Sequence, residues 1–339
     1  MSLPAFRLRS CRQGRRATGY AIASVLRCAS HWANAHPSHA SRKKSLAIIW
    51  ILCIITHISS WAQQDSSVYQ PKRMRWVVGI SATGYAATMG SVYAFWYAKE
   101  PRCPFHWFDD QHEWKQVDKL GHTYAAYQQS RIAIQAMKWT GISRKKAVWI
   151  GGMYGILMQH PIEYFDGLMC KYGASVADLV ANTVGSALVI TEELLWQEQR
   201  IDLKFSAHLT PYAAQRPDLL GKTFSERILK DYNGQTYWLS FNIYDFLGEK
   251  AQKWYPKWLC MSIGYGADGL LGDYQKPLPW IVKQREFRQW YISLDLNLRK
   301  VHTKYKVLNH VLHAFNLLKV PFPAVEFSRK GTRVHPLYF

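Results

Sequence analysis

Three short polar motifs lie in the middle of the chain, each within a segment that otherwise has the composition of a buried helix. They are Asp118-Lys119-x-x-His122, Glu163-x-x-Asp166 and Asp178-x-x-x-Asn182-x-x-Gly185. Side chains three or four residues apart share one face of a helix, so each motif directs its polar groups the same way. A buried carboxylate is costly unless it is paired or bound to a metal. We therefore expect three helices to bring these groups to one site.

Two kinds of chemistry would suit such a site. As a metal centre it would be rich in oxygen with one imidazole, which suits Mg, Mn or Zn, and a bound divalent cation could polarise a phosphoryl oxygen or activate water. The candidate ligands are Asp118, His122, Glu163, Asp166 and Asp178. As an acid–base site, His122 would titrate near neutral pH, and Glu163 and Asp166 would be the other catalytic candidates.

A structural polar network is the alternative, and we favour it over catalysis because clustered ionisable groups also organise helices. In this interpretation Lys119 or Arg131 pairs with a carboxylate, His122 bonds Glu163 and Asn182 bonds the backbone. Asp118 would cap the start of its helix. Ser175 is the expected N-cap of the helix that carries Asp178, with its hydroxyl accepting from the first turn.

The helices that must position these groups span residues 118–139, 145–166 and 175–199. Before them, residues 76–98 form a run without charged side chains, and Lys99 follows this run. At about 1.5 Å per residue, such a helix is long enough to cross a bilayer. Because small residues such as glycine also let helices pack closely in membranes, we favour a membrane-embedded or membrane-lying helix over a buried soluble one.

The N-terminal region is typical of export. Residues 1–64 contain nine Lys or Arg and no acid, within a chain of formal net charge +20. An apolar run over 46–58 follows Arg42-Lys43-Lys44 and is itself followed by Ser60-Trp61-Ala62, which predicts a secretory signal peptide cleaved after Ala62. No lipid anchor is expected at Cys53, because a large residue precedes it. The basic charge suits an anionic lipid surface, whereas export argues against nucleic acid.

The chain beyond residue 200 changes character. Residues 202–209, 287–298 and 323–328 alternate apolar and polar side chains, which indicates strands, and one helix is predicted over 304–318. The remaining cysteines, Cys103, Cys170 and Cys260, show no metal-binding spacing and allow one disulfide whose pairing stays open.

The motifs together resemble a known family. The ordered set of the three motifs, with Gly173 and Ser175, is similar to the YfiM-like family of predicted periplasmic lipoproteins of unknown function. Residues 230–240 and 335–339 resemble its longer members from Bacteroidetes-type bacteria. The helical core is similar, more distantly, to VanZ-like membrane proteins. This resemblance implies a bacterial cell-envelope location and no assigned catalytic activity.

The sequence therefore predicts an α+β protein with three parts: a leader and signal peptide (1–62), a membrane-associated helical bundle with the polar cluster (63–200), and a strand-rich region with one further helix (201–339). We expect a periplasm-facing, membrane-associated envelope protein, in the inner or the outer membrane, whose cluster organises the bundle. The alternative is a metal-dependent hydrolase or transferase acting on a lipid or cell-wall phosphate.

Overall fold

Six antiparallel strands form one sheet in sequence order, from β1 to β6. The computed structural model describes residues 68–98, 100–272 and 286–338, so the predicted leader and its cleavage site lie outside the described residues. The strands are β1 (Ile201–Ala207), β2 (Gln235–Phe241), β3 (Leu259–Asp268), β4 (Phe287–Leu296), β5 (Phe322–Ser328) and β6 (Gly331–Tyr338). The antiparallel order explains the alternation of apolar and polar residues that the sequence shows.

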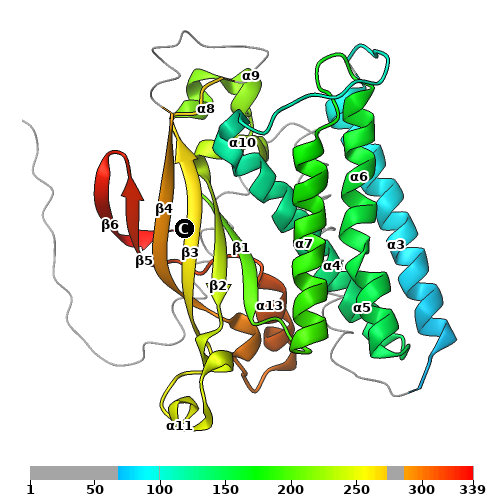
Figure 1. Ribbon diagram of the computed structural model, residues 1–339, viewed down its shortest axis with the longest axis vertical. Coiled ribbons are helices and arrows are strands. Elements are labelled where there is room, and N and C mark those ends of the chain that lie inside the picture. The colour runs from blue at the N-terminus through cyan, green and yellow to red at the C-terminus, as the bar shows by residue number, and fades with distance from the viewer. Residues whose placement is uncertain (1–67, 99, 273–285, 339) are drawn as a thin grey trace, which may run out of the picture. The chain divides into compact units, whose positions relative to one another are not determined.

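Helices precede the sheet in the chain and pack on one part of it (Figure 1). The long helices are α3 (Pro71–Val92), α4 (Val117–Trp139), α5 (Arg144–Gly152), α6 (Tyr154–Gly167) and α7 (Val176–Leu195). Helix α4 contacts strands β1, β2 and β3 as well as α5, α6 and α7. The side chain of Gln128 in α4 donates to the carbonyl of Leu203 in β1 over 2.6 Å. Helix α4 is therefore the element that joins the helices to the sheet.

The helices approach one another closely at glycines. A Cβ on Gly185 of α7 would lie 2.2 Å from the carbonyl oxygen of Thr123 in α4. Buried apolar side chains fill the remaining space and form a common core of Tyr127, Ile134, Val148, Val189, Ile190 and Leu203. The close approach of α7 to the Thr123 carbonyl is available only to a residue without a side chain, which explains Gly185 at the end of the third motif.

The region beyond residue 200 holds more helix than the sequence indicates. The predicted helix over 304–318 is present as α13 (Lys306–Phe315). Shorter helices connect the strands, so the prediction of one further helix is wrong: they are α8 (Tyr212–Gln215), α9 (Pro217–Leu220), α10 (Phe224–Lys230) and α11 (Glu249–Gln252). The predicted helix over 145–166 is divided, with α5 ending at Gly152 and α6 beginning at Tyr154.

The expected membrane bundle is not supported. In the part of the chain that the structure describes, no helix combines the length and apolar character that crossing a membrane requires. The uncharged run over 76–98 forms α3 and a short π-helix, Tyr93–Tyr97. Glycine, serine and threonine make this run uncharged without making it strongly apolar, which is why the absence of charge was misleading.

One disulfide joins Cys103 in the loop before α4 to Cys170 after α6, whereas Cys260 is a buried free thiol. The sequence allowed a single disulfide without fixing its partners. Disulfides persist in oxidising compartments, so this bond agrees with an exported protein.

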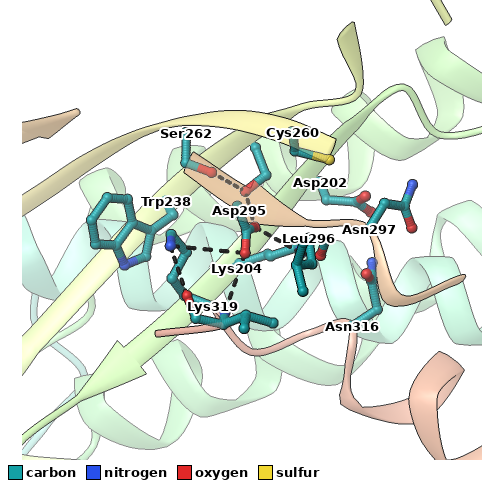
Figure 2. Close-up of polar contacts among 12 residues, drawn as sticks. Asp202, Lys204, Trp238, Cys260, Ser262, Asp295, Leu296, Asn297, Asn316 and Lys319 are labelled. Atoms are coloured by element: carbon teal, nitrogen blue, oxygen red, sulfur yellow. Dashed lines mark hydrogen bonds and ion pairs between the residues drawn. The ribbon is translucent and has the colours of Figure 1, made fainter. Parts of the chain in front are cut away.

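One face of the sheet buries an ionic network (Figure 2). Lys204 of β1 is fully buried, and its ammonium lies 2.8 Å from Oδ2 of Asp295 in β4. The same carboxylate oxygen accepts from the hydroxyl of Ser240 over 2.6 Å, and Lys319 lies 3.8 Å from the other oxygen. Burial lowers the pKa of Lys319 to about 8, against the pull of Asp295. These groups satisfy one another inside the sheet, which indicates a structural network.

Candidate functional site

The three motifs meet where the N-terminal turns of α4 and α7 lie beside the end of α6. Asp118 is in the first turn of α4 and Asp178 is in the first turn of α7. The hydroxyl of Ser175 caps α7 by accepting from the Asp178 amide over 3.1 Å, as the sequence predicts. Negative charge is favoured at these helix starts because the helix dipole presents its positive end there.

The ammonium of Lys119 lies at the centre of the site. It is 2.6 Å from Asp110 Oδ2, 3.0 Å from Asp118 Oδ2 and 2.7 Å from Asp178 Oδ1. Burial opposes the charged form of this lysine, but Asp118 and Asp178 outweigh it and raise its pKa. One protein cation therefore pairs with carboxylates from a loop and two helices. We call Asp110, Asp118, Lys119, His122, Glu163 and Asp178 the Lys119 cluster.

His122 lies between the acids of α6 and α7. Its Nδ1 is 3.2 Å from Oδ1 of Asn182, whereas Glu163 Oε1 is 3.9 Å away. The predicted pairing of His122 with Glu163 is present as an ion-pair contact rather than a hydrogen bond, whereas Asn182 bonds the imidazole and not the backbone. Burial would lower the pKa of His122, but Asp118 and Asp178 raise it. The imidazole thus carries positive charge more readily than a free histidine.

Protons are distributed unequally over the carboxyl groups. Burial would raise the pKa of Asp118, but His122 and Lys119 hold it below its ordinary value. Burial, followed by the charge of Asp118, raises the pKa of Asp178 to about 6. Burial, followed by the charge of Asp178, raises the pKa of Glu163 to about 8. Near neutral pH Asp118 and Asp178 are ionised while Glu163 is mostly protonated.

Two predicted participants have hydrogen-bond partners outside the Lys119 cluster. Asp166 accepts a hydrogen bond of 2.9 Å from the hydroxyl of Tyr97, and burial raises its pKa to about 7. Arg131 donates to Gln128 over 3.1 Å and does not pair with the acids of this cluster. The structure assigns the pairing role to Lys119, one of the two cations that the sequence allowed.

The sequence missed two partners that come from distant segments. Asp110 lies in the loop before α4, where its Oδ1 accepts from the Ser175 hydroxyl over 2.5 Å. The hydroxyl of Tyr232, more than a hundred residues beyond Asp118, donates to its Oδ1 over 2.6 Å. The pair Asp109-Asp110 is visible in the sequence but looks like an ordinary solvated loop, and nothing in the chain links Tyr232 to α4.

A metal ion would have three donors at hand. Asp118, His122 and Asp178 each present one ligand atom, and these atoms all lie within 4.8 Å of one another. Glu163 and Asp166, which the sequence included among the ligands, are not in this group. Two of the three donors are carboxylates already in contact with Lys119, so a cation would compete with the ammonium. The donor set fits a divalent ion chemically, but the Lys119 ammonium already supplies positive charge to two of these donors.

The comparisons with known proteins support the envelope assignment. Residues 106–192 match the model of a family described as predicted periplasmic lipoprotein (DUF2279). No curated protein and no solved structure matches the chain. The matched stretch contains all three motifs and the whole Lys119 cluster. Over these residues the chain is therefore similar to a family of periplasmic lipoproteins of unknown function, which supports a location in the cell envelope on the periplasmic side.

Proposed function

We propose that this protein is a non-enzymatic component of the bacterial envelope and that the Lys119 cluster fastens the loop before α4 to α4, α6 and α7. The contact of one ammonium with carboxylates from three separate segments carries this proposal. Removing one member of a buried ion pair leaves an uncompensated charge, which typically costs about 3–5 kcal/mol. A cluster of this kind selects one arrangement of the helices.

We infer a finer kinship with YfiM-like proteins, and more distantly with VanZ-like membrane proteins, because the motifs that resemble them are the ones that build the cluster. We also propose association with a membrane or another anionic lipid surface, supported by a net charge of +11 once the nine basic residues of the predicted leader are subtracted from +20, and by aromatic side chains on the surface such as Trp254 and Trp258. Tryptophan favours the boundary between an apolar and an aqueous phase.

A metal-dependent hydrolase or transferase for a lipid or cell-wall phosphate is the second candidate. The donor atoms of Asp118, His122 and Asp178 are close enough to hold one ion. The side chain of His122 is 20% exposed, so a ligand could reach it. In this case Lys119 would leave the carboxylates when the metal binds, and protonated Glu163 would be the general acid.

Metal analysis of the purified protein separates the two candidates. The structural role predicts no stoichiometric divalent metal, and it predicts that His122→Ala lowers the melting temperature while changing no metal content. The exposed His302 provides a matched control, since His302→Ala should leave both quantities unchanged. One metal ion per chain that is lost in His122→Ala would reject the structural role in favour of the metal site.

A further inference from the structure

A groove of about 410 Å³ lies between α4 and the first four strands. Gln116, which precedes α4, lines it together with Lys119, Leu120 and Thr123 of α4, which follow helical spacing. The face that carries Asp118 and His122 turns instead toward the Lys119 cluster. We call this hollow the α4–sheet groove. Its size lies within the range of pockets that bind small molecules.

The sheet face that forms one wall of the groove carries apolar side chains in rows across the strands, and these rows continue beyond the groove. One row is aliphatic: Leu203, Leu239, Ile263, Ile292, Val325 and Val334 are paired in register from β1 to β6. The next row is aromatic: Phe205, Tyr237, Tyr265, Trp290 and Phe327 are paired in the same way. Leu239, Ile263 and Trp290 line the groove and are still partly exposed to solvent. Leu120 and Tyr124 of α4 pack against the core that contains Tyr237, whereas these three side chains remain open to solvent.

One end of the groove is cationic. Arg288 of β4 lines it, is exposed, and is held in place by two donated bonds, to Tyr265 Oη over 3.0 Å and to Gln116 Oε1 over 2.6 Å. Arg288 is paired with Ala267, four residues along the strands from Ile263 and Ile292. At about 3.3 Å per residue, the guanidinium end and the aliphatic row are roughly 13 Å apart along the strands.

The backbone beside this end adopts an unusual conformation. Trp114, Lys115 and Gln116 have positive φ values of 48°, 51° and 65°. The hydroxyl of Tyr265 bonds the carbonyl of Lys115, and Lys115 pairs with Glu286 over 3.2 Å. Left-handed conformation is unfavourable for residues other than glycine and persists where surrounding contacts enforce it, often at ligand sites. These contacts place Gln116 against Arg288.

We propose that the α4–sheet groove binds one anionic amphiphile, with its acyl chain against Leu239, Ile263 and Trp290 and its carboxylate or phosphate head at Arg288. Charge complementarity sets the orientation, because Arg288 is an exposed cation of the lining whereas the Lys119 ammonium is already paired with carboxylates. The apolar wall excludes a purely ionic ligand, since apolar surface is its main contact. The groove adjoins the Lys119 cluster, because Lys119 lines it, but binding of a head group at Arg288 requires no particular role of that cluster.

Isothermal titration with decanoate and with decanol, both kept monomeric, tests the proposal on the purified protein. We expect one decanoate per chain and at least ten-fold weaker binding of decanol. Arg288→Gln should reduce decanoate affinity to that of decanol and leave decanol binding unchanged. Decyl phosphate, as a third probe, tells whether a carboxylate or a phosphate head is preferred at the guanidinium.

Two isoleucines give a matched pair of variants. Ile263 lines the groove and is 39% exposed, whereas its cross-strand partner Ile292 lies outside the groove and is 43% exposed. Ile263→Gln should weaken decanoate binding at least ten-fold, and Ile292→Gln should leave it within two-fold. Equal losses in both variants would show binding across the open sheet face, and no loss in either would place the ligand elsewhere. Both results would overturn the proposal, as would equal affinity for decanoate and decanol in the unaltered protein.

Discussion

Glu163→Gln should remove a pH-dependent loss of stability. The side chain of Glu163 is buried, with 3% of the residue exposed, and its Oε2 accepts from the Ser175 amide over 3.2 Å. Its Oε1 has no hydrogen-bond partner among the described residues. Burial and the charge of Asp178 raise its pKa from 4.5 to about 8. The folded protein therefore favours the protonated acid, which the neutral glutamine imitates.

The sign and size of the effect follow from proton linkage. Between pH 4.5 and about 8 the folded state binds this proton and the unfolded state releases it. The contribution of this group to the free energy of unfolding is therefore fully present below pH 4.5. It falls as the pH rises, by up to about 1.4 kcal/mol per pH unit. The full window corresponds to about 5 kcal/mol, and the glutamine variant should lose this dependence.

Urea denaturation at pH 5.0 and pH 8.5 measures the effect as the difference between the unaltered protein and the variant, so that titration of the neighbouring acids largely cancels. We expect the variant to be the more stable protein at pH 8.5, by several kcal/mol, and to differ little at pH 5.0. The exposed Glu249 supplies the control, since Glu249→Gln should be neutral at both values. A variant that is less stable at pH 8.5 would refute the reasoning, because the ionised carboxylate would then be stabilising, as a metal ligand would be.

Three further substitutions or treatments test the scaffold. Lys204→Met should destabilise the protein by about 3–5 kcal/mol in chemical denaturation, because Asp295 stays buried without its 2.8 Å partner, and adding Asp295→Leu should restore part of the loss. Reduction of Cys103–Cys170, which are 67 residues apart, should lower the free energy of unfolding by about 4 kcal/mol from loop entropy, measured with and without a thiol reductant. Gly185→Ala should lower stability by roughly 1–3 kcal/mol by forcing α7 from the Thr123 carbonyl, whereas the exposed Val184→Ala should change the melting temperature little.

Local patterns predicted the parts of the site that lie on single helices. Helical spacing placed Asp118 beside His122, and the N-cap chemistry of Ser175 predicted the start of α7, both of which the structure shows. Helical spacing does not predict which partner a side chain finds. Asp166 is three residues from Glu163, but it bonds Tyr97. A shared face limits the direction of two side chains without requiring that they meet the same partner.

Contacts between distant segments could not be read from the chain. The bond from Tyr232 to Asp118 depends on how the sheet region packs against α4, which no local periodicity encodes. Local patterns do not indicate a strand around Gly264, because glycine weakens strand propensity, yet this segment forms the centre of β3. A Cβ on Gly264 would lie 2.6 Å from the ring of Trp238, so the glycine makes room for a tryptophan of the neighbouring strand.

The central claim is that the Lys119 ammonium is the cation of the cluster, and melting of Lys119→Met with and without divalent metal tests it most directly. We predict that the unaltered protein melts at the same temperature in EDTA and in millimolar Mn²⁺. Lys119→Met should melt roughly 10 °C lower and recover in Mn²⁺, because the metal would then fill the place that the ammonium left. An unaltered protein whose melting temperature falls in EDTA, or a variant as stable as it, would contradict the claim.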